Sequence, residues 1–195
     1  MKFKNLFFAG LVVGLTSLQA CKSKTENKET VKEEIVEMKE EVKTPITIVD
    51  VASSKENFST LTTAIKAADL VETLNSDGPF TVFAPTNDAF AKLPEGTVEN
   101  LLEPESNAKL SSILTYHVIS GKFDAKALTT AINNNNGKFE VNTLQGGKLV
   151  ASLTNGNVIL TDEKGNTSTV VMTDIDASNG IIHAIDKVVM PIMPK

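Results

Sequence analysis

The stretches GPFTVFAPTNDAF (Gly78–Phe90) and NGIIHAIDKVVMP (Asn179–Pro191) decide the fold of this chain. In the first, the apolar run at residues 80–84 predicts a strand, and the Pro-Thr-Asn-Asp that follows offers cap oxygens for a helix running through Phe90. In the second, residues 181–189 are apolar on both faces when they are placed on a strand. A strand that is apolar on both faces is typical of a central, buried position in a sheet.

On either side of the first stretch the pattern is helical. The residues Leu61, Ala64, Ile65, Ala68 and Val71 recur on one helix face, with Asn57 as the predicted N-cap. Leu110, Ile113 and Leu114 predict a further helix that leads into Tyr116 and His117. From Lys138 onward the pattern alternates as strands do, and Asn155-Gly156 predicts a tight hairpin turn. Helices followed by a strand meander indicate an α+β domain over residues 45–195.

A third stretch, ILTYHVISG (Ile113–Gly121), lies between the first two. In this order and at this spacing, the three stretches closely resemble the motifs of the fasciclin domain, and the resemblance runs from Pro45 to Pro191. It implies a single α+β domain, a fasciclin-like wedge of two small antiparallel β-sheets flanked by helices. It also implies a module of adhesion or binding that is not an enzyme.

The resemblance assigns roles to particular residues. Tyr116, His117 and His183 occupy motif positions that chiefly hold the fold in this family. Asp174 and Ile175 occupy the place of an Asp-Ile pair that animal members use for integrin adhesion, so they form a candidate adhesion surface. Asp176 stands where those members have Leu or Met, which argues against the same partner here.

The two histidines are the only imidazoles available for chemistry. His183 lies on the predicted buried strand, so we expect a neutral ring bonded to a backbone partner more than a metal ligand or a general base. His117 follows an apolar helix face and is also expected to point inward. A zinc site needs three or four ligands, and only carboxylates could complete one, so no metal or cofactor is expected. Acidic residues near turns, such as Asp162 and Glu163, are expected to be solvated.

The remaining composition excludes several classes of function. The chain has no Gly-x-Ser-x-Gly, no phosphate-binding glycine loop and no His-Glu-x-x-His. All 19 basic residues are lysines and the formal net charge is −5, which argues against nucleic-acid recognition. We therefore expect a non-catalytic module that binds protein or polysaccharide at the cell surface or matrix. The alternative is a lipoprotein that binds a small molecule or glycan for envelope transport, which needs a concave apolar pocket.

The N-terminal residues have a different character. Lys2 and Lys4 precede an apolar run that ends in Leu-Gln-Ala-Cys21, which resembles a bacterial lipoprotein signal. Residues 1–20 are the expected signal peptide, with diacylglycerol on the Cys21 thiol; an ordinary secretory signal is the alternative. Residues 22–44, with 6 lysines and 7 glutamates, then predict a solvated tether more than a short coiled coil. The expected location is the cell envelope of a Gram-negative bacterium, at the outer membrane, facing the periplasm or the exterior.

Overall fold

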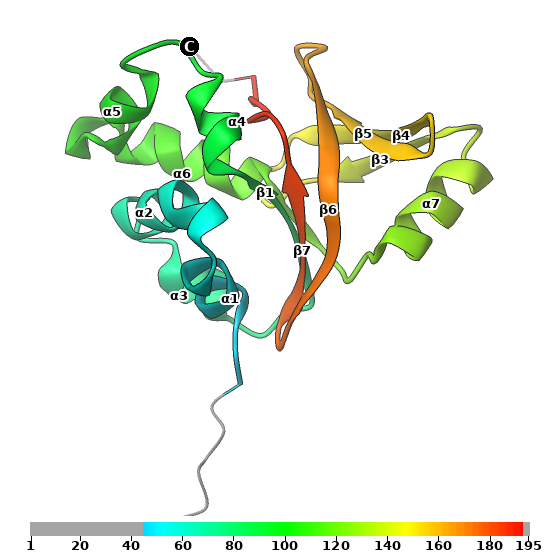
Figure 1. The fold of residues 1–195 in the computed structure, drawn as a ribbon, viewed down its shortest axis with the longest axis horizontal. Helices are drawn as coiled ribbons and strands as arrows, with labels where there is room; N and C mark the ends of the chain where they lie inside the picture. The colour runs from blue at the N-terminus through cyan, green and yellow to red at the C-terminus, as the bar shows by residue number, and fades with distance from the viewer. Residues whose placement is uncertain (1–44, 193–195) are drawn as a thin grey trace, which may run out of the picture. The chain divides into compact units, whose positions relative to one another are not determined.

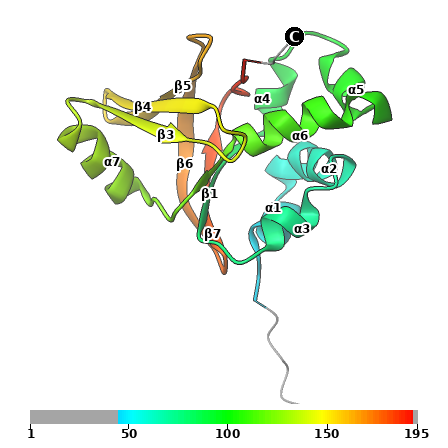
Figure 2. The same ribbon diagram turned by 180° about the vertical axis from the view of Figure 1, so that it is seen from behind.

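The computed structural model describes residues 45–192. Its helices are α1 (Ile48–Ser54), α2 (Ser59–Ala67), α3 (Val71–Asn75), α4 (Asn87–Ala91), α5 (Thr97–Leu102), α6 (Asn107–Tyr116) and α7 (Ala125–Asn134), with the 3-10 turns η1 (Glu56–Phe58) and η2 (Pro104–Ser106). Its strands are β1 (Phe80–Pro85), β2 (Val118–Ser120), β3 (Lys138–Asn142), β4 (Lys148–Thr154), β5 (Asn157–Thr161), β6 (Thr167–Ala177) and β7 (Gly180–Ile185). Helices α1 to α6 gather on one side of the strands, and α7 lies on the other side, near β3 and β4 (Figures 1 and 2).

The strands form one sheet in the order β2-β1-β7-β6-β5-β4-β3. Its strand pairs are antiparallel apart from β1 and β7, which run parallel with Phe80 opposite Gly180. A bridge between Ile119 of β2 and Thr143, just beyond β3, brings the two edges together, so the sheet is nearly closed.

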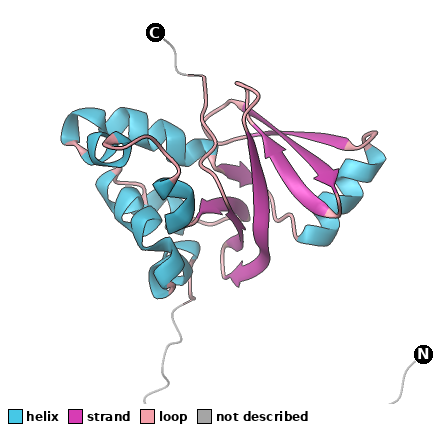
Figure 3. Cartoon of the chain, turned by 45° about the horizontal axis from the view of Figure 1, so that its top comes forward, coloured by secondary structure: helices cyan, strands magenta, loops and turns pink. Residues whose placement is uncertain are grey.

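The prediction of two small antiparallel sheets is therefore wrong, although the mixture of helices and strands is as expected. The reason is the length of β6, which has 11 residues. Its first residues pair with β5, and the residues from Val170 onward pair with β7. The long strand β6, labelled in Figure 1, thus joins β5 and β7 into one sheet, and Figure 3 shows the strands of this sheet in magenta.

The parallel pair β1 and β7 has residues in both of the two apolar clusters that make up the core. Val82 and Ile182 face the larger apolar cluster beneath the helices α1 to α6. Phe83 and Ile185 point to the opposite face, where a second cluster includes side chains of α7 and of the strands β3 to β6. All six residues of β7 are buried, which confirms the predicted central strand, although it ends at Ile185. A side chain at Gly180 would overlap the Phe80 carbonyl, so this pairing requires glycine.

The start of α2 is capped from a distant part of the chain. The prediction that Asn57 is the cap is wrong, because this residue lies inside the turn η1. Asn87, the first residue of α4, instead accepts the Thr60 backbone N–H at 3.1 Å and donates to the Glu56 carbonyl at 2.8 Å. A residue of the first motif thus holds two neighbouring helices together.

Left-handed backbone conformations set two further turns. Asp69 has φ 54° and follows the end of α2, so the predicted single helix face over residues 61–71 belongs to two helices, α2 and α3. Asn155 and Gly156 have φ 52° and 81°, which confirms the predicted hairpin turn between β4 and β5, since this turn type needs positive φ at both positions.

Candidate functional site

His183 joins three segments through both of its ring nitrogens. Its Nε2 lies 2.7 Å from the Phe123 carbonyl oxygen, and its Nδ1 accepts the Asp174 backbone N–H at 3.3 Å. A carbonyl only accepts and an amide only donates, so the ring is neutral with its proton on Nε2. Burial lowers the pKa of His183 below its usual value of 6.5. Both nitrogens are committed, so neither is free to bind a metal or to remove a proton.

His117 has the opposite tautomer. It follows the last residue of α6, and its Nδ1 lies 2.7 Å from the Ile113 carbonyl oxygen while its Nε2 accepts the Val189 N–H at 3.3 Å. The ring is fully buried, and this burial lowers the pKa of His117 from 6.5 to about 4. The two histidines therefore have separate backbone partners, and each ring is neutral at pH 7.

Tyr116 is buried beside His117 and is also bonded to backbone groups. Its hydroxyl donates to the Lys148 carbonyl at 2.6 Å and accepts the Glu163 N–H at 3.3 Å. Burial raises the pKa of Tyr116 to about 12, so the phenol stays protonated. Its bonds connect the end of α6 to the start of β4 and to the turn after β5.

Asp174 and Ile175, the candidate adhesion surface, lie where β6 is irregular. The register of β6 against β7 shifts twice before Ile175, and Asp174 has φ 59°. The exposed Asp174 carboxylate accepts the Ala125 N–H at 2.8 Å, at the start of α7. Ile175 is half-buried and packs against the apolar core beneath the helices. The structure thus exposes one member of the pair and packs the other, and their adhesive role stays a prediction.

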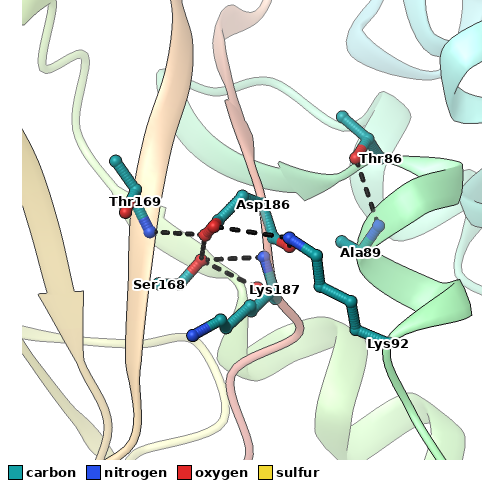
Figure 4. Close-up of polar contacts among 7 residues, drawn as sticks. All are labelled: Thr86, Ala89, Lys92, Ser168, Thr169, Asp186 and Lys187. Atoms are coloured by element: carbon teal, nitrogen blue, oxygen red, sulfur yellow. Dashed lines mark hydrogen bonds and ion pairs between the residues drawn. The ribbon is translucent and has the colours of Figure 1, made fainter.

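Asp186, which follows β7, connects three elements of the fold, a role that the sequence analysis did not predict. Its carboxylate accepts the Thr169 N–H at 2.7 Å and lies 3.3 Å from the Ser168 hydroxyl, and its carbonyl accepts from Lys92 Nζ at 2.8 Å (Figure 4). The Ser168 hydroxyl also accepts the Lys187 N–H at 3.1 Å. Burial acts to raise the pKa of Asp186, but the Thr169 N–H and the Lys92 charge outweigh it and lower the pKa. The bonds of Asp186 connect β6, β7 and the end of α4.

The structure also contradicts the expectation for Asp162. It was expected to be solvated, but it is buried, with 5% of its surface exposed. Its carboxylate accepts the N–H groups of Lys164 and Asn166 in the turn after β5 and that of Met190 near the C-terminus. The local sequence predicts the turn after β5, but it does not indicate that Asp162 bonds to Met190. The burial of Asp162 could therefore not be predicted from the local pattern.

Comparison of the sequence with models of protein families identifies the family of this chain. The family model described as "Fasciclin domain" matches residues 56–191. The chain belongs to the fasciclin domain family. This confirms the resemblance drawn from the three sequence stretches.

Several relatives of this fasciclin domain protein are bacterial or animal proteins. "Protein sll1483" of Synechocystis sp. is 53% identical over 148 residues, covering 76% of this chain and 75% of that protein. The pig "Transforming growth factor-beta-induced protein ig-h3" is 40% identical over 151 residues, covering 74% of this chain and 19% of that protein. A solved FAS1 domain pair from the insect cell adhesion molecule Fasciclin I superposes with a TM-score of 0.65 at 20% identity, covering 76% of this chain and 51% of that chain. At this identity the superposition shows the fold alone.

A surface cleft of about 500 Å³ lies between η1 and the middle of β6. It is lined by Lys55, Glu56, Asn57, Phe58, Thr86, Val171, Met172 and Ala184. Val171 and Met172 are 57% and 46% exposed, which is unusual for large apolar side chains of a strand. The sequence analysis missed this cleft; the only local signal is the run Val170-Val171-Met172, where apolar residues do not alternate with polar ones.

Two further observations concern only residues 45–192. Among them, no group of three or more His, Cys, Asp or Glu side chains is placed to hold a metal ion. In the same part of the chain, no helix has both the length and the apolar character needed to cross a membrane. Cys21, the expected signal peptide and the expected tether lie outside the described residues, so the lipid anchor stays a prediction.

Proposed function

We propose that this fasciclin domain protein is a non-catalytic adhesion or matrix-binding module, held in a bacterial cell envelope by lipid on Cys21. The observation that carries this proposal is that buried titratable side chains of the domain form hydrogen bonds with backbone groups. Both ring nitrogens of His117 and of His183 form hydrogen bonds with backbone groups. The carboxylates of Asp162 and Asp186 accept backbone N–H groups in the same way. These groups stabilise the fold, which favours a function performed by the surface.

The comparisons give this proposal its direction. The solved structure with the same fold comes from a protein described as a cell adhesion molecule, and the chain shares its family with the animal ig-h3 protein. A partner at the cell surface or in the matrix, either protein or polysaccharide, is consistent with both. The absence of arginine and the net charge of −5 argue against a nucleic-acid partner.

An attachment assay tests the proposed function. A strain that lacks the protein is compared with the same strain carrying the wild-type chain, on surfaces coated with extracellular matrix from that bacterium. We expect the deletion to reduce attachment and the wild-type chain to restore it. Equal attachment of both strains, with unchanged aggregation between cells, would contradict an adhesive function.

The cleft beside Val171 and Met172 supports a second candidate, a lipoprotein that binds a small molecule or glycan. Its volume of about 500 Å³ falls in the range of roughly 300–1,000 Å³ that ligand pockets occupy. Under this alternative, deletion would alter uptake of a nutrient while leaving attachment unchanged. Measuring uptake and attachment in the same two strains therefore separates the candidates.

A further inference from the structure

The middle of β6 departs from the alternation of a regular strand. Ser168 and Val170 are buried in alternate positions, but Val171 and the three residues after it are all exposed. The register against β7 shifts between Val170 and Met172 and again between Met172 and Ile175. Such bulges change the direction of side chains and are common beside binding sites. Here the two consecutive side chains Val171 and Met172 line the same cleft instead of opposite faces of the sheet.

The floor and walls of the cleft favour an apolar occupant. Ala184 of β7 also lines the cleft, and Met172 is an adaptable side chain of the kind used on binding surfaces. The Thr86 hydroxyl, which accepts the Ala89 N–H at the start of α4 (Figure 4), keeps one O–H donor for an occupant. Phe58 is the one aromatic residue of the lining, and it is only 2% exposed. Its ring therefore has no open face on which a sugar could stack.

The rim of the cleft carries one charge of each sign. Lys55 and Glu56 are both exposed, and among the described residues the ion pairs are those of Lys92, Lys122 and Lys148, so neither rim charge is used. An apolar floor with a basic and an acidic group at its edge complements a peptide that has a large apolar side chain between an acidic and a basic one. A glycan or a neutral small molecule can form hydrogen bonds with these two groups, but it neutralises neither charge.

We propose that the cleft between η1 and β6 binds an extended peptide segment of a partner protein, through a large aliphatic side chain that contacts Val171 and Met172. Side chains of opposite charge on either side of it pair with Lys55 and Glu56. The inference rests on the proposed adhesive function and narrows its partner from protein or polysaccharide to protein. It also places the contact on the same strand as Asp174 and Ile175, next to the surface that the sequence predicts.

Methyl NMR of the full chain in detergent micelles tests the cleft directly. The chain has 5 methionines, so Met172→Leu assigns the Met172 methyl signal. The probes are short blocked peptides with Glu-Leu-Lys or Lys-Leu-Glu at the centre, the same peptides with Ala for Leu, and maltohexaose. We expect a saturable shift of the Met172 signal with a leucine peptide, with apparent affinity about tenfold weaker for the alanine peptides, as loss of a buried aliphatic group implies. Added salt should weaken the binding of the leucine peptide, because salt screens the two charge pairs at the rim.

Three outcomes of this experiment overturn the inference. A shift of the Met172 signal by maltohexaose alone assigns the cleft to a glycan. A shift that grows with protein concentration without any probe assigns it to a second copy of the chain. No saturable shift with either leucine peptide shows that the cleft does not recognise peptides of this kind.

The attachment assay connects the cleft to adhesion. The variant Val171→Ser with Met172→Ser is compared with the control Ile46→Ser with Leu144→Ser, which changes exposed apolar residues outside the cleft. Protease treatment of the coated surface removes the part of attachment that depends on a protein partner. We expect the first variant to lose this part of attachment with an unchanged unfolding midpoint, and the control to attach normally. Normal attachment by the first variant overturns the inference but leaves the proposed function intact. If the wild-type chain itself confers no attachment, the proposed function fails, and the NMR result still decides whether the cleft binds peptide.

Discussion

The Asn179 side-chain oxygen accepts the backbone N–H of Ile48 at 3.0 Å, although the two residues are 131 positions apart. The Asn179 amide nitrogen donates to the carbonyls of Leu74, at 2.7 Å, and Ser76, at 3.1 Å. One side chain in the turn between β6 and β7 therefore holds the start of α1 and the end of α3. These bonds explain physically why asparagine stands at the beginning of the second sequence stretch.

The change Asn179→Ala should lower the free energy of unfolding by about 2–3 kcal/mol, because it leaves an N–H and two carbonyls without their partner. Urea denaturation of both proteins measures the difference. The matched control is Asn134→Ala, at the exposed end of α7, which should change stability by less than about 0.5 kcal/mol. Equal effects of the two changes would show that the Asn179 bonds do not stabilise the fold.

Acid should destabilise the protein through His117. Its pKa is about 4 in the folded state and near 6.5 when unfolded, so between these values the unfolded chain binds more protons. Stability is therefore fully present above pH 6.5 and falls as the pH drops toward 4, by up to roughly 3 kcal/mol at 1.36 kcal/mol per unit. Burial lowers the pKa of His183 too, so it contributes with the same sign.

The free energy of unfolding, measured at intervals between about pH 7 and 4.5, tests this dependence. The Asp50 and Asp186 carboxyls have pKa values lowered from 3.8, so their contributions are lost only at still lower pH. The change His117→Gln should flatten the curve in this window. A wild-type curve that is already flat would show that His117 is protonated without cost in the folded protein.

The parts of the fold that could be predicted are those set by local patterns. The apolar run at residues 80–84, the buried strand containing His183 and the turn at Asn155-Gly156 each follow from neighbouring residues. The parts that could not be predicted depend on distant partners. The cap on α2 comes from Asn87, and the joining of β5 to β7 through β6 depends on the pairing of a strand whose register shifts twice.

The candidate site shows the same division. The inward position of the histidines follows from apolar spacing, but their tautomers depend on the carbonyls of Ile113 and Phe123 and on the N–H groups of Val189 and Asp174. The cleft depends on bulges in β6, for which the sequence offers only the broken alternation at Val171. A bulge is defined by the pairing of one strand with its partner, here β6 with β7, and the local pattern of one strand does not contain that register.

His183→Ala should lower the free energy of unfolding by roughly 1–3 kcal/mol, because the Asp174 N–H and the Phe123 carbonyl lose their partner and a cavity forms beside Phe83. Thermal and urea unfolding measure the change, and attachment is measured alongside. A variant that unfolds like wild type yet loses attachment or a bound metal would show that His183 belongs to a functional site.

Cys21 is the predicted lipid anchor, and Cys21→Ser tests it. The variant should leave the membrane fraction or accumulate as an uncleaved precursor, because lipid attachment needs the thiol. Cell fractionation and intact-mass measurement distinguish the two results, and Ser23→Ala provides a control substitution close by in the sequence. Unchanged fractionation together with unchanged mass would rule out lipidation at this residue.

The last prediction concerns Asp174, the exposed member of the candidate adhesion pair. Its carboxylate accepts the Ala125 N–H, so a simple truncation removes a bond of the scaffold as well as a surface charge. Asp174→Asn separates the two, because asparagine keeps an oxygen acceptor and tolerates the positive φ of 59°. We expect Asp174→Asn to change stability by less than about 0.5 kcal/mol and to reduce attachment, since it removes only the charge.

Asp174→Ala combined with Ile175→Ala should instead lower the free energy of unfolding by roughly 2–4 kcal/mol, because Ile175 also packs against the core. Unfolding and attachment are measured on the same preparations. If Asp174→Asn attaches like wild type, and the double variant loses stability while its folded fraction still attaches, both residues belong to the scaffold and the contact surface lies elsewhere.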